Sequence, residues 1–172
     1  MPRLLVNTQR KARLLEKIGL DLLVYEKFTR EIAALTPEQF VLDILLKQLH
    51  IKEVFVGFNH SFGYKGRGTP ELLQMLGQEH GFQVHITPPV KVDGEIVSSS
   101  LIRQALEQGK INRAAKMLGY HPLLDGLVIE GERRGRQLGF PTANIGIDSI
   151  YNVPAKGVYA ALARVNEHCC SA

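Results

Sequence analysis

The first two thirds of the chain alternate between stretches with apolar residues at helical spacing and short apolar runs. Two of these stretches begin with the same signal, a capping Thr followed by Pro, at residues 36–37 and 69–70. A further helix is predicted over residues 7–18, and two shorter ones over residues 101–107 and 111–118. A Gly follows soon after the end of each, as is common where a helix stops.

Short apolar runs rich in β-branched and aromatic residues lie between the first helices, at residues 20–25, 54–57 and 82–86. Strands that alternate with helices of about 10–15 residues indicate βαβ units and a parallel sheet. Asp93-Gly94 then marks a loop or a short hairpin. The pattern therefore predicts an α/β domain.

The pattern changes after residue 122. Short β-like runs follow, separated by loops rich in Gly, Arg and Pro, and no strong amphipathic helix is predicted. These runs are residues 127–129, 143–147 and 158–165. Three short strands in about fifty residues can enclose little core. We therefore expect an α/β domain over residues 1–122 and the beginning of an all-β domain over residues 123–172.

Composition narrows the class of protein. The 172 residues are 45% hydrophobic and 22% charged, with a net charge of +4, as in a soluble globular protein. No apolar run approaches the ~18 residues of a membrane helix, and no signal-peptide pattern opens the sequence, so a cytoplasmic protein with no membrane partner is expected. The basic residues form no stripe, which argues against a nucleic-acid partner. Oligomeric state is not indicated.

A glycine-rich stretch at residues 135–144 is the most specific motif, reading Gly-Arg-Gln-Leu-Gly-Phe-Pro-Thr-Ala-Asn. Closely spaced glycines let backbone N–H groups approach phosphate oxygens, and Thr142 and Asn144 offer neutral oxygens to Mg²⁺. The candidate nucleotide loop consists of Gly131, Gly135, Arg136 and Gly139. The alternative is a glycine-rich hairpin whose Thr and Asn satisfy local backbone groups, and the pattern alone favours that alternative.

Two further stretches are candidates for ligand binding. After the predicted strand at residues 54–57, Asn59 could hydrogen-bond the edge of a flat ring system on which Phe62 stacks. A glycine-rich turn with a core Phe explains that segment equally well. The second stretch precedes a helix, where hydroxyls and unpaired N–H groups form an anion site and Arg103 adds charge. Plain N-capping by serine is its alternative. The residues of this phosphate segment are Ser98, Ser99, Ser100 and Arg103.

These three motifs, in their order along the chain, resemble those of bacterial bifunctional riboflavin kinase/FMN adenylyltransferases, the FAD synthetases. The resemblance implies a Rossmann-like nucleotidyltransferase domain followed by the N-terminal part of a kinase β-barrel. It also implies ATP, FMN and riboflavin as substrates, with Mg²⁺ as the metal. Asn59 and Phe62 would then contact flavin, the phosphate segment would bind ATP, and Thr142 with Asn144 would hold the metal. His60 stands where that family usually has Phe.

The resemblance has gaps. No H-x-G-H turn, which contacts ATP phosphates in that family, occurs in the sequence, and no match to the kinase's catalytic Glu is found. We therefore expect a domain without its first strand and histidine turn, name no catalytic residue, and expect little activity of the chain as given. The alternative is an inactive flavin- or nucleotide-binding remnant or gene fragment.

Overall fold

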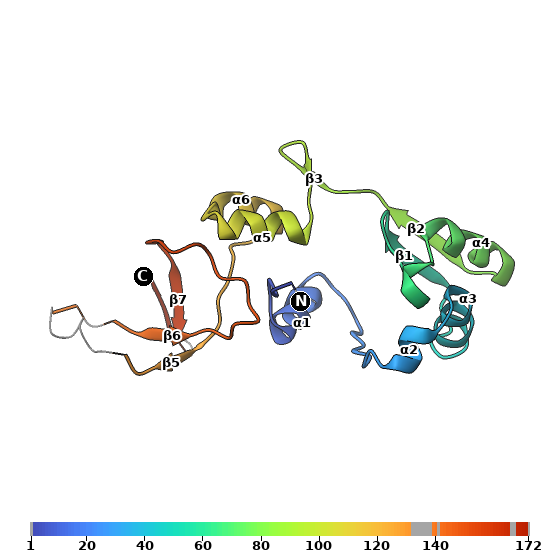
Figure 1. Ribbon diagram of the computed structural model, residues 1–172, viewed down its shortest axis with the longest axis horizontal. Helices are drawn as coiled ribbons and strands as arrows, with labels where there is room; N and C mark the ends of the chain where they lie inside the picture. The colour runs from blue at the N-terminus through green and yellow to red at the C-terminus, as the bar shows by residue number, and fades with distance from the viewer. Residues whose placement is uncertain (1, 132–138, 141, 166–167, 172) are drawn as a thin grey trace. The chain divides into compact units, whose positions relative to one another are not determined.

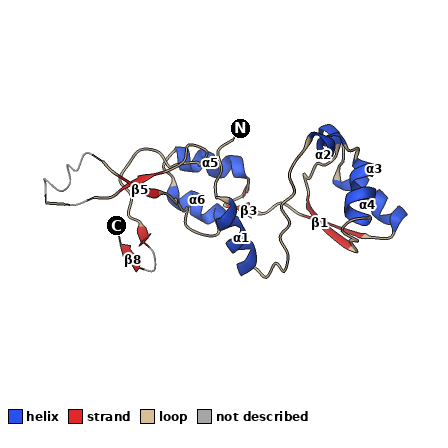
Figure 2. Cartoon of the chain, turned by 90° about the horizontal axis from the view of Figure 1, so that it is seen from below, coloured by secondary structure: helices blue, strands red, loops and turns tan. Residues whose placement is uncertain are grey.

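The computed structural model describes residues 2–131, 139–140, 142–165 and 168–171, and their contacts separate into two compact units. Unit 1 comprises Met1–Asp21 and Val97–Ala172, and unit 2 comprises Leu22–Ile96. Together the described residues form a mixed structure of helices and sheet (Figures 1 and 2). None of their helices is long and apolar enough to cross a membrane.

A strand–helix–strand motif organises unit 2. Strands β1 and β2 pair in parallel, with Glu53 opposite Gln83 and Gly57 opposite Thr87, and α4 connects them (Figure 1). The elements of this unit are α2 (Arg30–Ala34), α3 (Pro37–Gln39), η1 (Phe40–Leu46), β1 (Glu53–Gly57), η2 (Tyr64–Gly66), α4 (Pro70–His80), β2 (Gln83–Thr87), β3 (Lys91–Val92) and β4 (Glu95–Ile96). The predicted βαβ unit is confirmed, and Asp93-Gly94 does form the turn of the β3–β4 hairpin.

Side-chain caps explain where the helices of unit 2 begin. Thr36 and Gln39 form the predicted capping box, with hydrogen bonds of 3.2 and 2.9 Å between each side chain and the other's backbone N–H. Thr69 caps α4 through the N–H of Leu72 at 3.3 Å, and Gly81 ends that helix at a φ of 76°. The helix that begins at Pro37 widens into the π-helical η1, which periodicity did not indicate.

The core of unit 2 lies between η1, α4 and the inner face of the β1–β2 pair. Because side chains alternate along a strand, Val56 points inward while Phe55 on the other face is 69% exposed. The buried members of this core are Val41, Val56, Phe62, Leu73, Leu76 and Phe82.

The prediction of a strand at residues 20–25 is wrong. The segment makes no ladder with any described strand, and Leu22, Val24 and Tyr25 remain exposed. An apolar run becomes a strand only when a partner satisfies its backbone groups, which local sequence does not reveal. The short helix α2 that follows was not predicted.

Unit 1 combines helices with short antiparallel strand pairs. Its elements are α1 (Thr8–Lys17), α5 (Ser99–Glu107), α6 (Ile111–Leu118), β5 (Leu127–Ile129), β6 (Asn144–Gly146), β7 (Leu162–Val165) and β8 (His168–Ser171). All three helices match the prediction within about two residues, the usual scatter of helix ends. Strand β5 pairs with β6, and β7 with β8. Strand β7 is shorter than predicted, and β8 was not predicted.

Helices α5 and α6 pack together around a small core of Ile102, Ala105, Leu106, Ala114 and Met117. Residues 97–122 belong to the same compact unit as the β-rich residues that follow. Compact units defined by contacts need not coincide with the domains expected from the sequence. The domain boundary between residues 122 and 123 therefore stays a prediction.

Candidate functional site

The segment that contains Asn59 and Phe62, called here the candidate flavin loop, follows the carboxyl end of β1. This is the edge at which open α/β sheets bind ligands. The N–H of His60 donates to the carbonyl of Gly57 at 3.0 Å, and the N–H of Phe58 donates to Thr87 at 3.0 Å. These bonds tie the loop to the ends of both parallel strands. Asn59 is exposed at the turn, where its amide is accessible to a ligand.

Phe62 is part of the core rather than the surface of this loop. Its side chain is 7% exposed, and its ring lies 5.9 Å from that of Phe40. The backbones of Phe62 and Gly68 exchange hydrogen bonds of 3.2 and 2.8 Å. A Cβ at Gly68 would lie 2.7 Å from the Phe62 ring, so only glycine permits this packing. A contact between Phe62 and flavin stays a prediction.

The loop presents two rings to solvent, that of Phe58, which is 43% exposed, and that of His60. The His60 ring is exposed and stacks on Phe62 with centroids 5.8 Å apart and an angle of 15° between the planes. Sequence reasoning noted His60 only as a departure from the usual Phe. Its position makes it a flat surface for a second aromatic ring.

The phosphate segment forms the beginning of α5. The Ser98 hydroxyl accepts the N–H of Leu101 at 3.2 Å, so Ser98 does cap the helix. Ser99 and Ser100 occupy the first turn and are exposed. N–H groups of a first turn have no partner within the helix and point toward its N-terminal side, where an anion is stabilised.

Arg103 is oriented by a residue that sequence reasoning missed. Its Nε donates to the backbone carbonyl of Arg3 at 2.7 Å, within unit 1. This bond uses only one of the guanidinium's five N–H donors, so the terminal groups keep the capacity to contact a phosphate. A carbonyl partner one hundred residues away leaves no signal in local sequence.

The structure describes only part of the candidate nucleotide loop. Gly135 and Arg136 lie outside the described residues. Gly131 is so close to the Asn144 amide that a Cβ at Gly131 would overlap it. Gly139 has a φ of 81°, and Thr142 is exposed. The fold thus brings a loop glycine beside one of the two candidate metal ligands.

The chemistry of these donors is compatible with Mg²⁺. Thr142 and Asn144 supply neutral oxygens, which suit a hard cation that also binds substrate phosphates. In the part of the chain that the structure describes, no three His, Cys, Asp or Glu side chains gather as a metal cluster. The side-chain donors of the candidate are the oxygens of Thr142 and Asn144.

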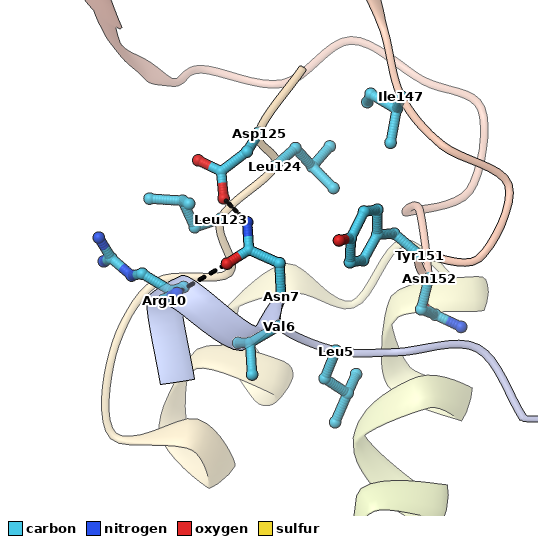
Figure 3. A pocket seen from close by; sticks show the side chains of 10 residues that line it. All are labelled: Leu5, Val6, Asn7, Arg10, Leu123, Leu124, Asp125, Ile147, Tyr151 and Asn152. Carbon is cyan, nitrogen blue, oxygen red and sulfur yellow. Dashed lines mark hydrogen bonds between the residues drawn. The ribbon is translucent and has the colours of Figure 1, made fainter. Parts of the chain in front are cut away.

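A small pocket in unit 1 was not anticipated (Figure 3). Asn7 caps α1 by accepting the N–H of Arg10 at 2.7 Å, and its Nδ2 donates to Asp125 at 2.9 Å. Tyr151 and Asn152 lie across from this pair in Figure 3. The full lining is Leu5, Val6, Asn7, Arg10, Leu123, Leu124, Asp125, Ile147, Tyr151 and Asn152.

Comparison with known families identifies the group to which these features belong. The family model for FAD synthetase matches residues 1–101, more than half of the chain. The chain belongs to the FAD synthetase family. A second model, for riboflavin kinase, matches residues 118–172. The family resemblance inferred from the three motifs is therefore confirmed.

Several relatives carry both activities in their names. A bifunctional riboflavin kinase/FMN adenylyltransferase of Listeria monocytogenes is 38% identical over 156 residues, covering 91% of this chain and 49% of the relative. The protein of that name from Escherichia coli strain K12 is 37% identical over 159 residues, covering 92% and 50%. That of Bacillus subtilis strain 168 is 34% identical over 165 residues, covering 95% and 51%. The chain spans about half the length of these relatives.

A solved structure also resembles this chain. A crystal structure from Streptococcus pneumoniae, described as a macrolide-efflux protein, has a TM-score of 0.87 at 30% sequence identity. The likeness covers 97% of this chain and 53% of that one. It supports the fold.

Proposed function

We propose that the chain binds ATP and FMN for the transfer of AMP to FMN, which yields FAD and pyrophosphate. The observation that carries the proposal is the beginning of α5, where exposed Ser99 and Ser100 and the oriented Arg103 combine N–H groups with a positive charge. That combination suits the phosphates of a nucleotide. The matched FAD synthetase family and the names of the relatives point to the same reaction.

In this reaction a phosphate oxygen of FMN attacks the α-phosphorus of ATP, and pyrophosphate leaves. No protein nucleophile is needed, so the protein's contribution is positioning and stabilisation of charge. Arg103 and the α5 N–H groups would hold ATP phosphates, while Asn59 and the aromatic rings beside it would hold the flavin. The comparisons do not favour an inactive remnant, because both matched families are named for enzymes.

The second half of the chain carries a related proposal. Residues 123–172 would contribute the nucleotide loop of a riboflavin kinase, which makes FMN from riboflavin and ATP. Gly131 beside Asn144 supports it, because a side chain there would displace the amide. Thr142 and Asn144 would hold Mg²⁺, which neutralises phosphate charge when bound. We retain residues 1–122 as a Rossmann-like domain and residues 123–172 as part of a β-barrel in this proposal.

Titration calorimetry with Mg-ATP and with FMN tests the central claim, followed by chromatographic detection of FAD. We expect both ligands to bind to the folded chain and Arg103→Ala to weaken ATP alone. A chain that is folded by circular dichroism but binds neither ligand would contradict the proposal.

A further inference from the structure

Asn152 is the one buried polar residue among those whose side chains the structure describes, with 4% exposure. Its backbone N–H donates to the carbonyl of Leu4 at 2.8 Å, and its Nδ2 donates to Glu107 Oε1 at 3.2 Å. A buried polar group is costly unless it is hydrogen-bonded, so the Nδ2 bond favours this placement of Asn152, whose Oδ1 has no partner among the described residues. One residue therefore ties three distant parts of unit 1 together.

The same neighbourhood holds α5 at further points. The N–H of Ala155 donates to the carbonyl of Leu106 at 3.0 Å, and the N–H of Leu4 donates to Ile150 at 2.7 Å. Next to Leu4, the carbonyl of Arg3 receives Arg103 Nε. Residues 150–155 thus form hydrogen bonds with the carboxyl end of α5 directly. They are linked to Arg103 through hydrogen bonds with residues 3–4.

We propose that Asn152 is a positioning residue for the ATP phosphate site, coupling the segment that matches riboflavin kinase to the helix that begins at Ser99. The proposal rests on the proposed function. Residues 150–155 lie within the range matched by the riboflavin kinase model, whereas Ser99 and Arg103 lie at the end of the FAD synthetase range or just beyond it. Nucleotide affinity at α5 then depends on a contact from the other half of the chain.

The physical basis is the fraction of molecules in which α5 holds one position relative to residues 3–4. Arg103 and the first-turn N–H groups act on one phosphate only while α5 stays fixed relative to residues 3–4. If the Asn152–Glu107 bond is lost, α5 samples other placements, and the apparent Kd rises as the binding-competent fraction falls. A general loss of stability would act by unfolding the unit, so it would weaken ATP binding only where the folded fraction of the chain also falls.

A donor–acceptor swap shows whether this bond is what matters, and affinities compared at an equal folded fraction, measured by circular dichroism, separate placement from stability. Asn152→Asp places a carboxylate against that of Glu107, and we expect ATP to bind about tenfold more weakly, equivalent to about 1.4 kcal/mol. Glu107→Gln keeps an acceptor for Asn152 and should bind ATP like the wild type. In the double variant Asn152→Asp with Glu107→Gln, the new amide donates to the new carboxylate, and affinity should return. Calorimetry with Mg-ATP measures affinity, and hydrogen exchange across α5 measures its placement.

Glu107→Ala covers the case in which Asn152→Asp does not fold. Glu107 is exposed, so removing its carboxylate breaks the bond without emptying a buried site. ATP affinity should fall in this variant, in the same direction as in Asn152→Asp. Unchanged affinity with unchanged α5 protection, or a swap that restores neither, overturns the coupling while the proposed function stands. A folded wild-type chain that binds no ATP overturns both.

Discussion

The imidazole of His60 lies nearly flat over the buried ring of Phe62, with ring centroids 5.8 Å apart and 15° between the planes. Phe62 in turn packs against Phe40 in the core of unit 2. This exposed ring of the candidate flavin loop is thus supported by two packed aromatic rings. A ligand stacked on the exposed side of this pair would contact His60 rather than Phe62.

Replacing His60 tests which ring contacts the flavin. His60→Ala should weaken FMN binding by about 0.5–1.5 kcal/mol, the scale of an aromatic pair, whereas His60→Phe should retain it. Fluorescence titration of FMN measures the change. Phe55→Ala is the control, because that ring is also exposed but lies on the outer face of β1. Equal losses in His60→Ala and Phe55→Ala would show that the loop ring has no special role.

Arg103→Ala should weaken Mg-ATP binding by about 1.5–3 kcal/mol, the scale of a hydrogen bond to a charged group. Arg13→Ala removes the same charge from an exposed position on α1 and should leave ATP affinity within about twofold, because solvent screens exposed charges. Calorimetry on both variants gives the comparison. An equal effect of the two would indicate that net charge, and not the α5 site, governs binding.

Gly131→Ala should displace the Asn144 amide, because the added Cβ overlaps it. The Asn144 side chain is exposed and can move away, so the β5–β6 pair should keep its amide protection in hydrogen exchange. Mg²⁺-dependent nucleotide binding at this loop should fall both in Gly131→Ala and in Asn144→Ala. Metal dependence that survives without Asn144 would remove that residue as a ligand.

The start of α4 makes a pH-dependent contribution to stability. The backbone N–H of Glu71 and the hydroxyl of Thr69 hold the pKa of the Glu71 carboxyl below its usual range. Because the folded pKa is depressed, the contribution is complete above the ordinary glutamate pKa of about 4.3 and is lost as the pH falls through the lower folded value. Glu71→Gln should therefore flatten the acid limb of the stability curve in urea unfolding. An unaltered acid limb would refute the assignment.

A side-chain cap of the same kind begins α2. Comparing the two caps separates the local cost of losing a cap from the contribution of tertiary packing to stability. The hydroxyl of Thr29 accepts the N–H of Ile32 at 3.4 Å and lowers the pKa of Glu31. Thr69→Ala should destabilise unit 2 by about 1 kcal/mol, the usual cost of losing an N-cap. Thr29→Ala should have a smaller effect, because α2 buries no residue. Comparable losses in urea unfolding would contradict this ranking.

Local sequence determined the helix starts and the strand–helix–strand motif. Four predicted helices begin with a side-chain cap, because a cap depends on groups only three residues away. The capping residues are Asn7, Thr36, Thr69 and Ser98. The motif order was likewise enough to identify the family, since residue identities carry it. Strands β5 and β6 also followed from short apolar runs, with β6 slightly shorter than predicted, whereas their pairing was not predicted.

Tertiary structure decided which of these residues are exposed and how they are oriented. Phe62 and His60 are both aromatic and two residues apart, yet only packing against Phe40 determines that Phe62 is buried and His60 exposed. Arg103 depends on the carbonyl of Arg3, and the Asn152–Glu107 bond depends on a similar long-range contact. The run at residues 20–25 has strand composition but no pairing partner among the described strands. Contacts between segments far apart in the chain leave no periodicity, so only the folded arrangement reveals them.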